Sequence, residues 1–202
     1  MTEHTPHEVK AWFEERFGNP EKESLTPRQR VIQTINREEP DRVPFDFWGV
    51  PEVIDRLVDY FGVADEQEML RLLGIDCRVV WPDYNGPALE QFEDNSFYGP
   101  WGFHRKLVQN DFSTYEEYAS FPLADAKTAE DVRVWDKWAN GRCWDWAKVP
   151  EQIDAMNTLV PYHIRYEVGG MFECAWAVYG LEKFLVDLIK NPEVPCAILD
   201  GY

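Results

Sequence analysis

The sequence predicts an α/β fold in which helices cover a parallel sheet. Short apolar, β-prone segments alternate along the chain with stretches of helical periodicity, an order typical of parallel strands joined by right-handed crossovers. Of the 202 residues, 45% are hydrophobic and 15% aromatic, so the chain can bury a substantial core. No internal repeat or low-complexity stretch competes with this interpretation.

The first elements are helical. Residues 1–24 are expected to form a helical extension in front of a main domain at residues 25–202. Four apolar side chains at helical spacing support this expectation: Val9, Trp12, Phe13 and Phe17. Residues 18–20 (Gly-Asn-Pro) then stop the helical pattern. Thr26 followed by Pro27 is a helix start signal, which predicts a helix to about Asn36.

Three strands are expected along the main domain. Residues 42–49 are apolar, β-prone and bounded by turn residues, which indicates a first buried strand. Pro51 begins a helix that Gly62 closes, and Asp65 begins a short helix with a capping-box pattern. Residues 75–81 form the second predicted strand. Residues 101–108 suggest a hairpin arm, whereas residues 115–147 carry short helical pieces and few strand signals.

The last part of the chain repeats the helix–strand–helix order. We expect a helix at about 150–158, the third strand at 162–168, and helices at 172–179 and 181–190. A final helix starts near Asn191. A three-stranded doubly wound sheet is the alternative architecture, but residues 47–51 contain one glycine and no Gly-rich phosphate loop after the first strand.

Composition narrows the function classes. The net charge of −17 argues against nucleic acid as a partner, and an anionic ligand would need a pocket whose local charge opposes the global one. The cysteines are widely spaced, as free thiols of a reducing compartment are: Cys77, Cys143, Cys174 and Cys196. The first residues are unlike a signal peptide, and no apolar run approaches ~18 residues. We therefore predict a cytoplasmic protein with no membrane contact.

Three segments, supported by residues 121–132, together carry a resemblance to a known family. They are residues 25–44 (LTPRQR through NREEPDRVP), residues 73–84 (LGIDCRVVWPDY) and residues 169–193 (GGMFE, VYGLE, FL and NPE). This combination resembles the uroporphyrinogen decarboxylase superfamily, which includes the decarboxylase of haem synthesis and corrinoid-linked methyltransferases that demethylate small methylated compounds. The resemblance covers about residues 25–202. It implies a (β/α)₈ TIM barrel, incomplete here: the chain would supply about the first three or four β/α units and be inactive alone.

The resemblance places a catalytic carboxylate at Asp83. The decarboxylases hold their reactive pyrrole on an aspartate at the end of the second strand, and residues 79–83 (VVWPD) put Asp83 at that place. A carboxylate at the carboxyl end of a barrel strand faces the barrel mouth, where it can bind ring N–H groups or steady a developing cation. Without the resemblance, Asp83 would simply begin the turn before residues 85–87.

The family comparison favours methyl transfer over haem-pathway decarboxylation. The decarboxylases carry two arginines just after the first strand to grip substrate carboxylates, and residues 47–51 contain none. An aromatic mouth suits a flat cofactor or a methylated aromatic substrate, although any single ring could equally belong to the core. We expect substrate-binding roles for Trp48, Tyr84, Glu167 and Trp176, with Trp81 beside them.

Glu167 is a candidate because residues 163, 165 and 167 share one face of the third strand, and Glu167 lies at the carboxyl end of that strand. Alternatively, Glu167 could form an ion pair with a neighbouring arginine, Arg165 or Arg78. His163 lies at the opposite end, where we expect a structural role. The small-molecule substrate would be demethylated with a corrinoid protein as partner. Zinc ligands of such methyltransferases would lie beyond Tyr202, and no metal ligand is predicted in this chain.

Two alternatives stay open. The first is a decarboxylase of uroporphyrinogen or of a smaller carboxylic acid. The second is a non-enzymatic half-barrel that binds a ligand or partner. A half-barrel exposes strand edges and an apolar face, so that protein would have to form a homodimer.

Overall fold

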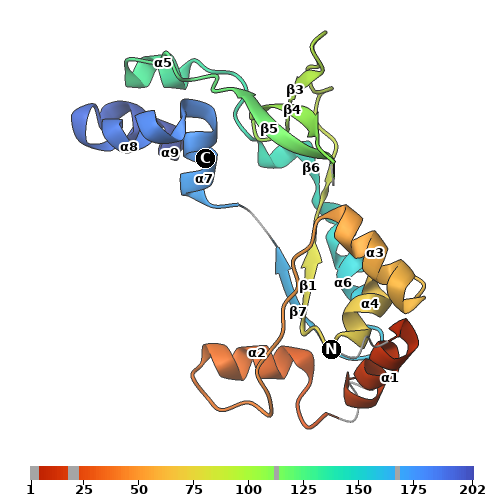
Figure 1. Ribbon diagram of the computed structural model, residues 1–202. Coiled ribbons are helices and arrows are strands. Elements are labelled where there is room, and N and C mark those ends of the chain that lie inside the picture. The colour runs from red at the N-terminus through yellow and green to blue at the C-terminus, as the bar shows by residue number, and fades with distance from the viewer. Residues whose placement is uncertain (1–4, 18–22, 112–113, 167–168) are drawn as a thin grey trace. The chain divides into compact units, whose positions relative to one another are not determined.

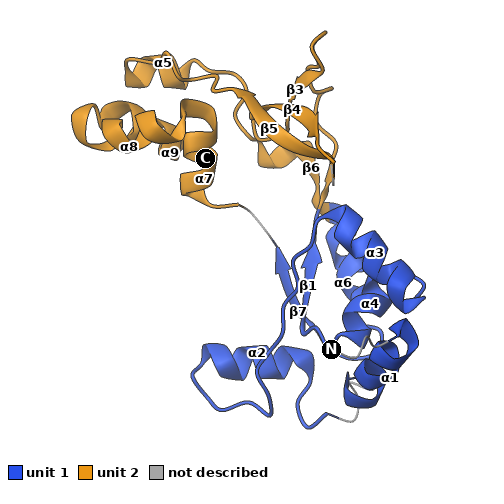
Figure 2. Ribbon diagram, viewed as in Figure 1, with its two compact units in different colours: residues 1–81, 147–167 blue, residues 82–146, 168–202 orange. Residues whose placement is uncertain are grey.

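The chain folds into two compact units in this computed structural model, which describes residues 5–17, 23–111, 114–166 and 169–202. Unit 1 comprises residues 1–81 and 147–167, and unit 2 comprises residues 82–146 and 168–202 (Figure 2). Helices and small sheets occur in both units (Figure 1). The predicted mixed α/β class is therefore confirmed at this level. Among the described residues, no helix is long and apolar enough to cross a membrane.

Unit 1 contains the helices whose ends the sequence predicts most directly. They are α1 (Pro6–Phe17), α2 (Pro27–Ile35), α3 (Pro51–Phe61), α4 (Glu66–Leu72) and α6 (Val149–Met156). The Thr26 hydroxyl accepts a hydrogen bond from the Gln29 N–H, and the Gln29 side chain accepts one from the Thr26 N–H. Gly62 ends α3 with a φ of 59°, a left-handed conformation that glycine adopts without strain.

The helices of unit 1 enclose a small apolar core. Its buried members come from α3, α4 and the residue that leads into β1: Phe61, Met69, Leu70, Leu72 and Ile75. Phe13 of α1 packs edge-on against Phe61 with ring centroids 5.9 Å apart. The predicted helix in residues 1–24 thus forms and contributes to the core of unit 1.

A parallel strand pair is the centre of unit 1. β1 (Cys77–Val80) pairs with β7 (His163–Tyr166) in parallel, with Cys77 opposite His163 and Val79 opposite Arg165. These are the second and third predicted strands, and their parallel pairing is confirmed. They lie side by side in Figure 1 although more than half of unit 2 separates them in sequence.

The first predicted strand is wrong. Residues 42–49, all of which the structure describes, form no strand. The Phe45 carbonyl accepts one backbone hydrogen bond, from the Asp76 N–H at 2.9 Å. The Phe45 N–H makes no backbone bond to the described residues because it donates to the Asp76 carboxylate at 2.7 Å. Pro44 has no N–H to add to a ladder. The segment therefore lies along β1 without pairing with it.

The β-structure of unit 2 consists of two small antiparallel sheets. β2 (Asp83–Tyr84) pairs with β6 (Trp144–Asp145), and β3 (Ser96–Tyr98), β4 (His104–Gln109) and β5 (Thr114–Ser120) form the other sheet in that order. The predicted hairpin arm appears as β4 paired with β5. The expectation of helical pieces from residue 115 onward is wrong for β5, whose exposed Glu116 pairs across the strands with Arg105 at 2.6 Å.

The helices of unit 2 form its larger core. They are α5 (Ala129–Arg133), α7 (Met171–Tyr179), α8 (Leu181–Lys190) and α9 (Glu193–Gly201), with a short 3₁₀ helix at Gly141–Cys143; a second one, Trp146–Lys148, lies where the chain passes into unit 1. The side chains they bury most deeply are Val132, Val178, Tyr179, Phe184, Val194 and Ile198. The helices predicted at 172–179, 181–190 and from Asn191 onward are confirmed.

Candidate functional site

The two faces of the β1–β7 pair differ in character. Alternation along the strands places Cys77, Val79, His163 and Arg165 on one face, which we call the polar face. These four side chains are half-buried. The opposite face carries Arg78 and Val80, which are 1% and 3% exposed, and α6 packs against β1. The polar face is therefore the more accessible side of β1, whereas all four residues of β7 are half-buried.

A charged group with an aromatic neighbour marks the polar face. The Arg165 guanidinium forms an ion pair with Asp46, with Nη2 3.1 Å from Oδ2. The same guanidinium lies over the Trp48 ring, 5.6 Å from its centroid. Arg165 is thus held between a carboxylate and an aromatic ring, the two kinds of partner that fix a guanidinium plane.

Cys77 lies on the same face but is not poised as a nucleophile. Burial, and next the negative charge of Asp46, raise the pKa of its thiol to about 11. The thiolate is the reactive and metal-binding form, so Cys77 is protonated and inert near neutral pH.

A small cavity of about 160 Å³ adjoins the polar face. It is lined by side chains of β1, of α4 and of the segment before α3, among them Asp46, Phe47, Cys77, Val79 and Trp81. The Trp81 ring in turn contacts Tyr166 edge-on, with centroids 5.6 Å apart. Aromatic rings thus surround the carboxyl end of the strand pair, and the cavity itself holds only a small group.

Asp83 and Tyr84, two of the predicted site residues, lie together on β2. Asp83 is exposed and opposite Asp145 in the β2–β6 register. Tyr84 packs edge-on against Trp144, with centroids 5.4 Å apart, and its hydroxyl donates to the Pro87 carbonyl oxygen at 3.1 Å. Asp83 therefore lies on a short antiparallel ribbon of unit 2, and not at the end of the parallel strand β1.

The other predicted site residues have separate surroundings. Trp48 is 69% exposed in unit 1, beside Arg165. Trp176 of α7 is half-buried in the core of unit 2, edge-on to Tyr118 at 5.2 Å. Glu167 lies outside the described residues, and Arg165, one of the partners considered for it, pairs with Asp46. Asp46, the carboxylate partner of Arg165, is a residue that the sequence analysis did not single out. Its place two residues before Trp48 is the sequence feature that could have indicated it.

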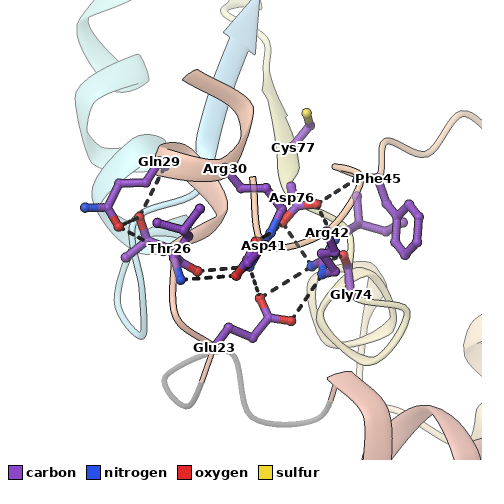
Figure 3. Close-up of polar contacts among 12 residues, drawn as sticks. Glu23, Thr26, Gln29, Arg30, Asp41, Arg42, Phe45, Gly74, Asp76 and Cys77 are labelled. Atoms are coloured by element: carbon purple, nitrogen blue, oxygen red, sulfur yellow. Dashed lines mark hydrogen bonds and ion pairs between the residues drawn. The ribbon is translucent and has the colours of Figure 1, made fainter. Parts of the chain in front are cut away.

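A buried ion network joins α2 to the start of β1 (Figure 3). Arg30 and Asp76 are both 0% exposed, and Nη1 of Arg30 lies 2.5 Å from Oδ1 of Asp76. The same guanidinium donates to Asp41 at 2.6 Å and to Glu23 at 2.6 Å. Arg42 donates to the other Asp76 oxygen at 2.8 Å and to the Gly74 carbonyl oxygen at 3.1 Å.

This network is a structural clamp rather than a reaction centre. Burial alone would lower the pKa of Arg30, but its hydrogen bonds to Asp41 and Asp76 and the nearby acidic charges raise it. Asp76 also accepts the Phe45 N–H, and its backbone carbonyl accepts the His163 N–H at 3.0 Å. Asp76 therefore ties α2 and the segment before α3 to β1 through its carboxylate, and β7 through its backbone carbonyl. Charges that are fully engaged in this way hold a fold in one arrangement.

Asp41 gives the clamp a predicted acid dependence. Hydrogen bonding to Arg30 lowers the pKa of Asp41 well below its ordinary value of 3.8. Because the folded-state pKa is the lower one, the stabilisation is complete above pH ~4 and is lost as the pH falls through the folded-state value. At pH 7, Asp41→Asn is expected to cost about 1.5–3 kcal/mol of unfolding free energy. Urea unfolding at pH 7 and at pH 3 measures the change.

The matched control is Asp59→Asn, which removes an exposed carboxylate from α3. The cost of Asp41→Asn should shrink between pH 7 and pH 3, while that of Asp59→Asn stays near zero. An Asp41→Asn cost that is equal at both pH values would contradict the ionic role of Asp41.

Comparison of the chain with family models, curated proteins and solved structures finds no match. A zinc ion, which the predicted family uses in some of its methyltransferases, has no ligand set in the part of the chain that the structure describes, where no three metal-binding side chains converge. The function therefore has to be argued from the polar face itself.

Proposed function

We propose that residues 25–202 are the N-terminal part of a uroporphyrinogen decarboxylase-like (β/α)₈ enzyme of the cytoplasm. The parallel β1–β7 pair supports this proposal, because helices cover one of its faces and the other carries polar side chains. In a barrel the uncovered face would point to the interior and the carboxyl strand ends to the active-site mouth. The four cysteines form no disulfide with one another, which supports the proposed location because disulfides are rare in the cytoplasm.

The proposed reaction is demethylation of a small methylated compound, with a corrinoid protein as the partner that accepts the methyl group. The single observation that carries it is the Arg165 guanidinium fixed by Asp46 beside the exposed Trp48. An aryl methyl ether leaves an oxygen anion when its methyl group departs, and a fixed guanidinium stabilises that charge. Trp48 offers an aromatic surface for the ring of such a substrate.

The remaining predicted residues stay candidates on the resemblance alone, because Asp83, Tyr84 and Trp176 belong to unit 2 and Glu167 lies outside the described residues. Asp83 is the candidate carboxylate for catalysis, and Tyr84, Trp176 and Glu167 are candidates for substrate contact. Residues 47–51 carry no arginine, which disfavours a substrate with many carboxylates.

The test is an assay of methyl transfer by the protein expressed from its complete gene. The protein is incubated with cob(I)alamin and methoxylated aromatic compounds, and methylation of the corrinoid is followed by its visible absorption. We expect turnover with at least one compound. Arg165→Gln should lower kcat by about tenfold or more, since one charge-assisted hydrogen bond to the leaving oxygen is lost, and Asp83→Asn should also lower kcat.

The matched control is Arg133→Gln, which removes an exposed charge from unit 2 and should leave turnover unchanged. Absence of methyl transfer with every compound, or turnover insensitive to Arg165→Gln, would count against the proposal.

Decarboxylation of a small carboxylic acid is the second candidate. It is favoured by the same guanidinium, since Arg165 on the polar face could anchor one carboxylate. Release of carbon dioxide without corrinoid would identify this reaction and replace the first proposal.

A further inference from the structure

The covered face of the strand pair holds a buried arginine whose charge is balanced by no carboxylate of the described residues. Arg78 is 1% exposed, and its Nη1 donates to the carbonyl oxygens of Ile75 at 2.9 Å and Cys77 at 2.8 Å. Among the described side chains, none accepts a hydrogen bond from its Nη2, and none forms an ion pair with it. The acid nearest in sequence, Asp76, is engaged by Arg30 and Arg42.

An aromatic ring holds this guanidinium in place. Arg78 lies over the ring of Tyr162, 3.8 Å from the centroid, and Tyr162 is 4% exposed. Stacking of this kind fixes the plane of the cation but leaves its outer N–H groups without an acceptor. A buried donor without a partner is costly, and more so when it is charged. Arg78 is therefore a cation that an incoming oxygen acceptor would stabilise.

A cavity of about 440 Å³ adjoins Arg78 between α4 and α6, within the size range of ligand pockets. We call it the Arg78 cavity. Arg71 and Tyr162 also line it, and among the described residues of the lining Glu68 is the single acid, paired with Arg71 at 3.5 Å. The described lining holds two guanidinium groups and one carboxylate, in a chain with a net charge of −17. This is the local reversal of charge that an anionic ligand requires.

The rest of the lining is largely apolar. Ala155, Met156 and Leu159 form one wall, and the unbranched Met156 side chain adapts readily to a ligand. Inorganic phosphate would leave this wall without a contact. A carboxylate with a short hydrocarbon chain would satisfy both parts of the lining.

We propose that the Arg78 cavity binds a small organic carboxylate. Its oxygens accept hydrogen bonds from the guanidinium groups of Arg78 and Arg71 and from the Tyr162 hydroxyl, and its hydrocarbon part lies against Met156 and Leu159. Because Arg78 and the polar-face residues alternate along β1 and β7, this site lies on the opposite side of the sheet from the proposed reaction site. It is a second ligand site and does not depend on the proposed reaction.

Calorimetric titration of the chain with sodium hexanoate, in a buffer without carboxylates and at constant ionic strength, tests the proposal. Hexanoate should bind saturably, whereas hexanol and inorganic phosphate should bind much more weakly. Arg78→Gln should weaken hexanoate binding by about tenfold or more, because a buried charge-assisted hydrogen bond is lost. Arg133→Gln, which removes the same charge from unit 2, should leave the affinity unchanged.

Ala155→Trp keeps the test decisive if Arg78→Gln does not fold. Residue 155 is exposed on α6, so an indole there is tolerated and blocks the cavity. Hexanoate binding should then disappear. The proposal is overturned by any of three results: no saturable hexanoate binding, an unchanged affinity in Ala155→Trp, or binding of hexanol or phosphate as tight as that of hexanoate.

Discussion

Replacing Asp76 by alanine is expected to lower the free energy of unfolding by about 3–5 kcal/mol, the usual cost of breaking a buried ion pair from one side. The substitution leaves the fully buried Arg30 without its 2.5 Å partner. It also removes one of the acceptors of Arg42 and the acceptor of the Phe45 N–H. Urea unfolding followed by far-ultraviolet circular dichroism measures the loss.

Two companion variants separate charge from shape at this position. Asp76→Asn keeps an oxygen acceptor but no charge, so its free energy of unfolding should lie between that of the wild type and that of Asp76→Ala. Glu130→Ala breaks an exposed pair, in which Arg133 lies 3.7 Å away, and should leave stability unchanged. If Asp76→Ala costs no more than Glu130→Ala, the clamp does not hold unit 1 together.

The helix ends could be predicted from the sequence because their signals act over a few residues. Thr26 and Gln29 form their capping box within one turn, and Gly62 ends α3 through its own φ angle. The segment at residues 42–49 could not be predicted in the same way. Its composition is that of a strand, but the decisive contact is the Asp76 carboxylate, which takes the N–H that a ladder would need.

Side-chain partners were the least predictable feature. Strand alternation alone predicts that residues 163 and 165 share a face. It does not identify the carboxylate that Arg165 meets, because Asp46 is 119 residues away in the chain. Arg30 and Asp76 are likewise 46 residues apart. Such pairs are fixed by the packing of whole elements, so composition could indicate an aromatic mouth but not the guanidinium beside it.

The strand pair β1–β7 carries two arginines, although the chain as a whole is strongly acidic. Arg165 lies on the polar face and Arg78 on the covered face, and each is held by an aromatic ring. Arg165 has a carboxylate partner in Asp46. Arg78 has none among the described residues, so its charge is not balanced by a neighbouring acid as that of Arg165 is.

In unit 2, Phe184→Ala is expected to cost about 3–5 kcal/mol of unfolding free energy, through lost burial and the cavity left behind. Phe184 is 1% exposed and belongs to the core that α7, α8 and α9 enclose. Its ring contacts Phe172 edge-on, with centroids 5.8 Å apart. Differential scanning calorimetry of the variant measures the loss.

The neighbouring residue supplies the control for that experiment. Leu185 is 47% exposed on the same helix, so Leu185→Ala removes a similar apolar side chain without opening a buried cavity. Its effect should stay within about 0.5 kcal/mol. Because the two positions are adjacent, helix propensity changes in the same direction for both, and the difference between the variants reports burial alone. Equal losses at the two positions would mean that α8 does not present Phe184 to the core of unit 2.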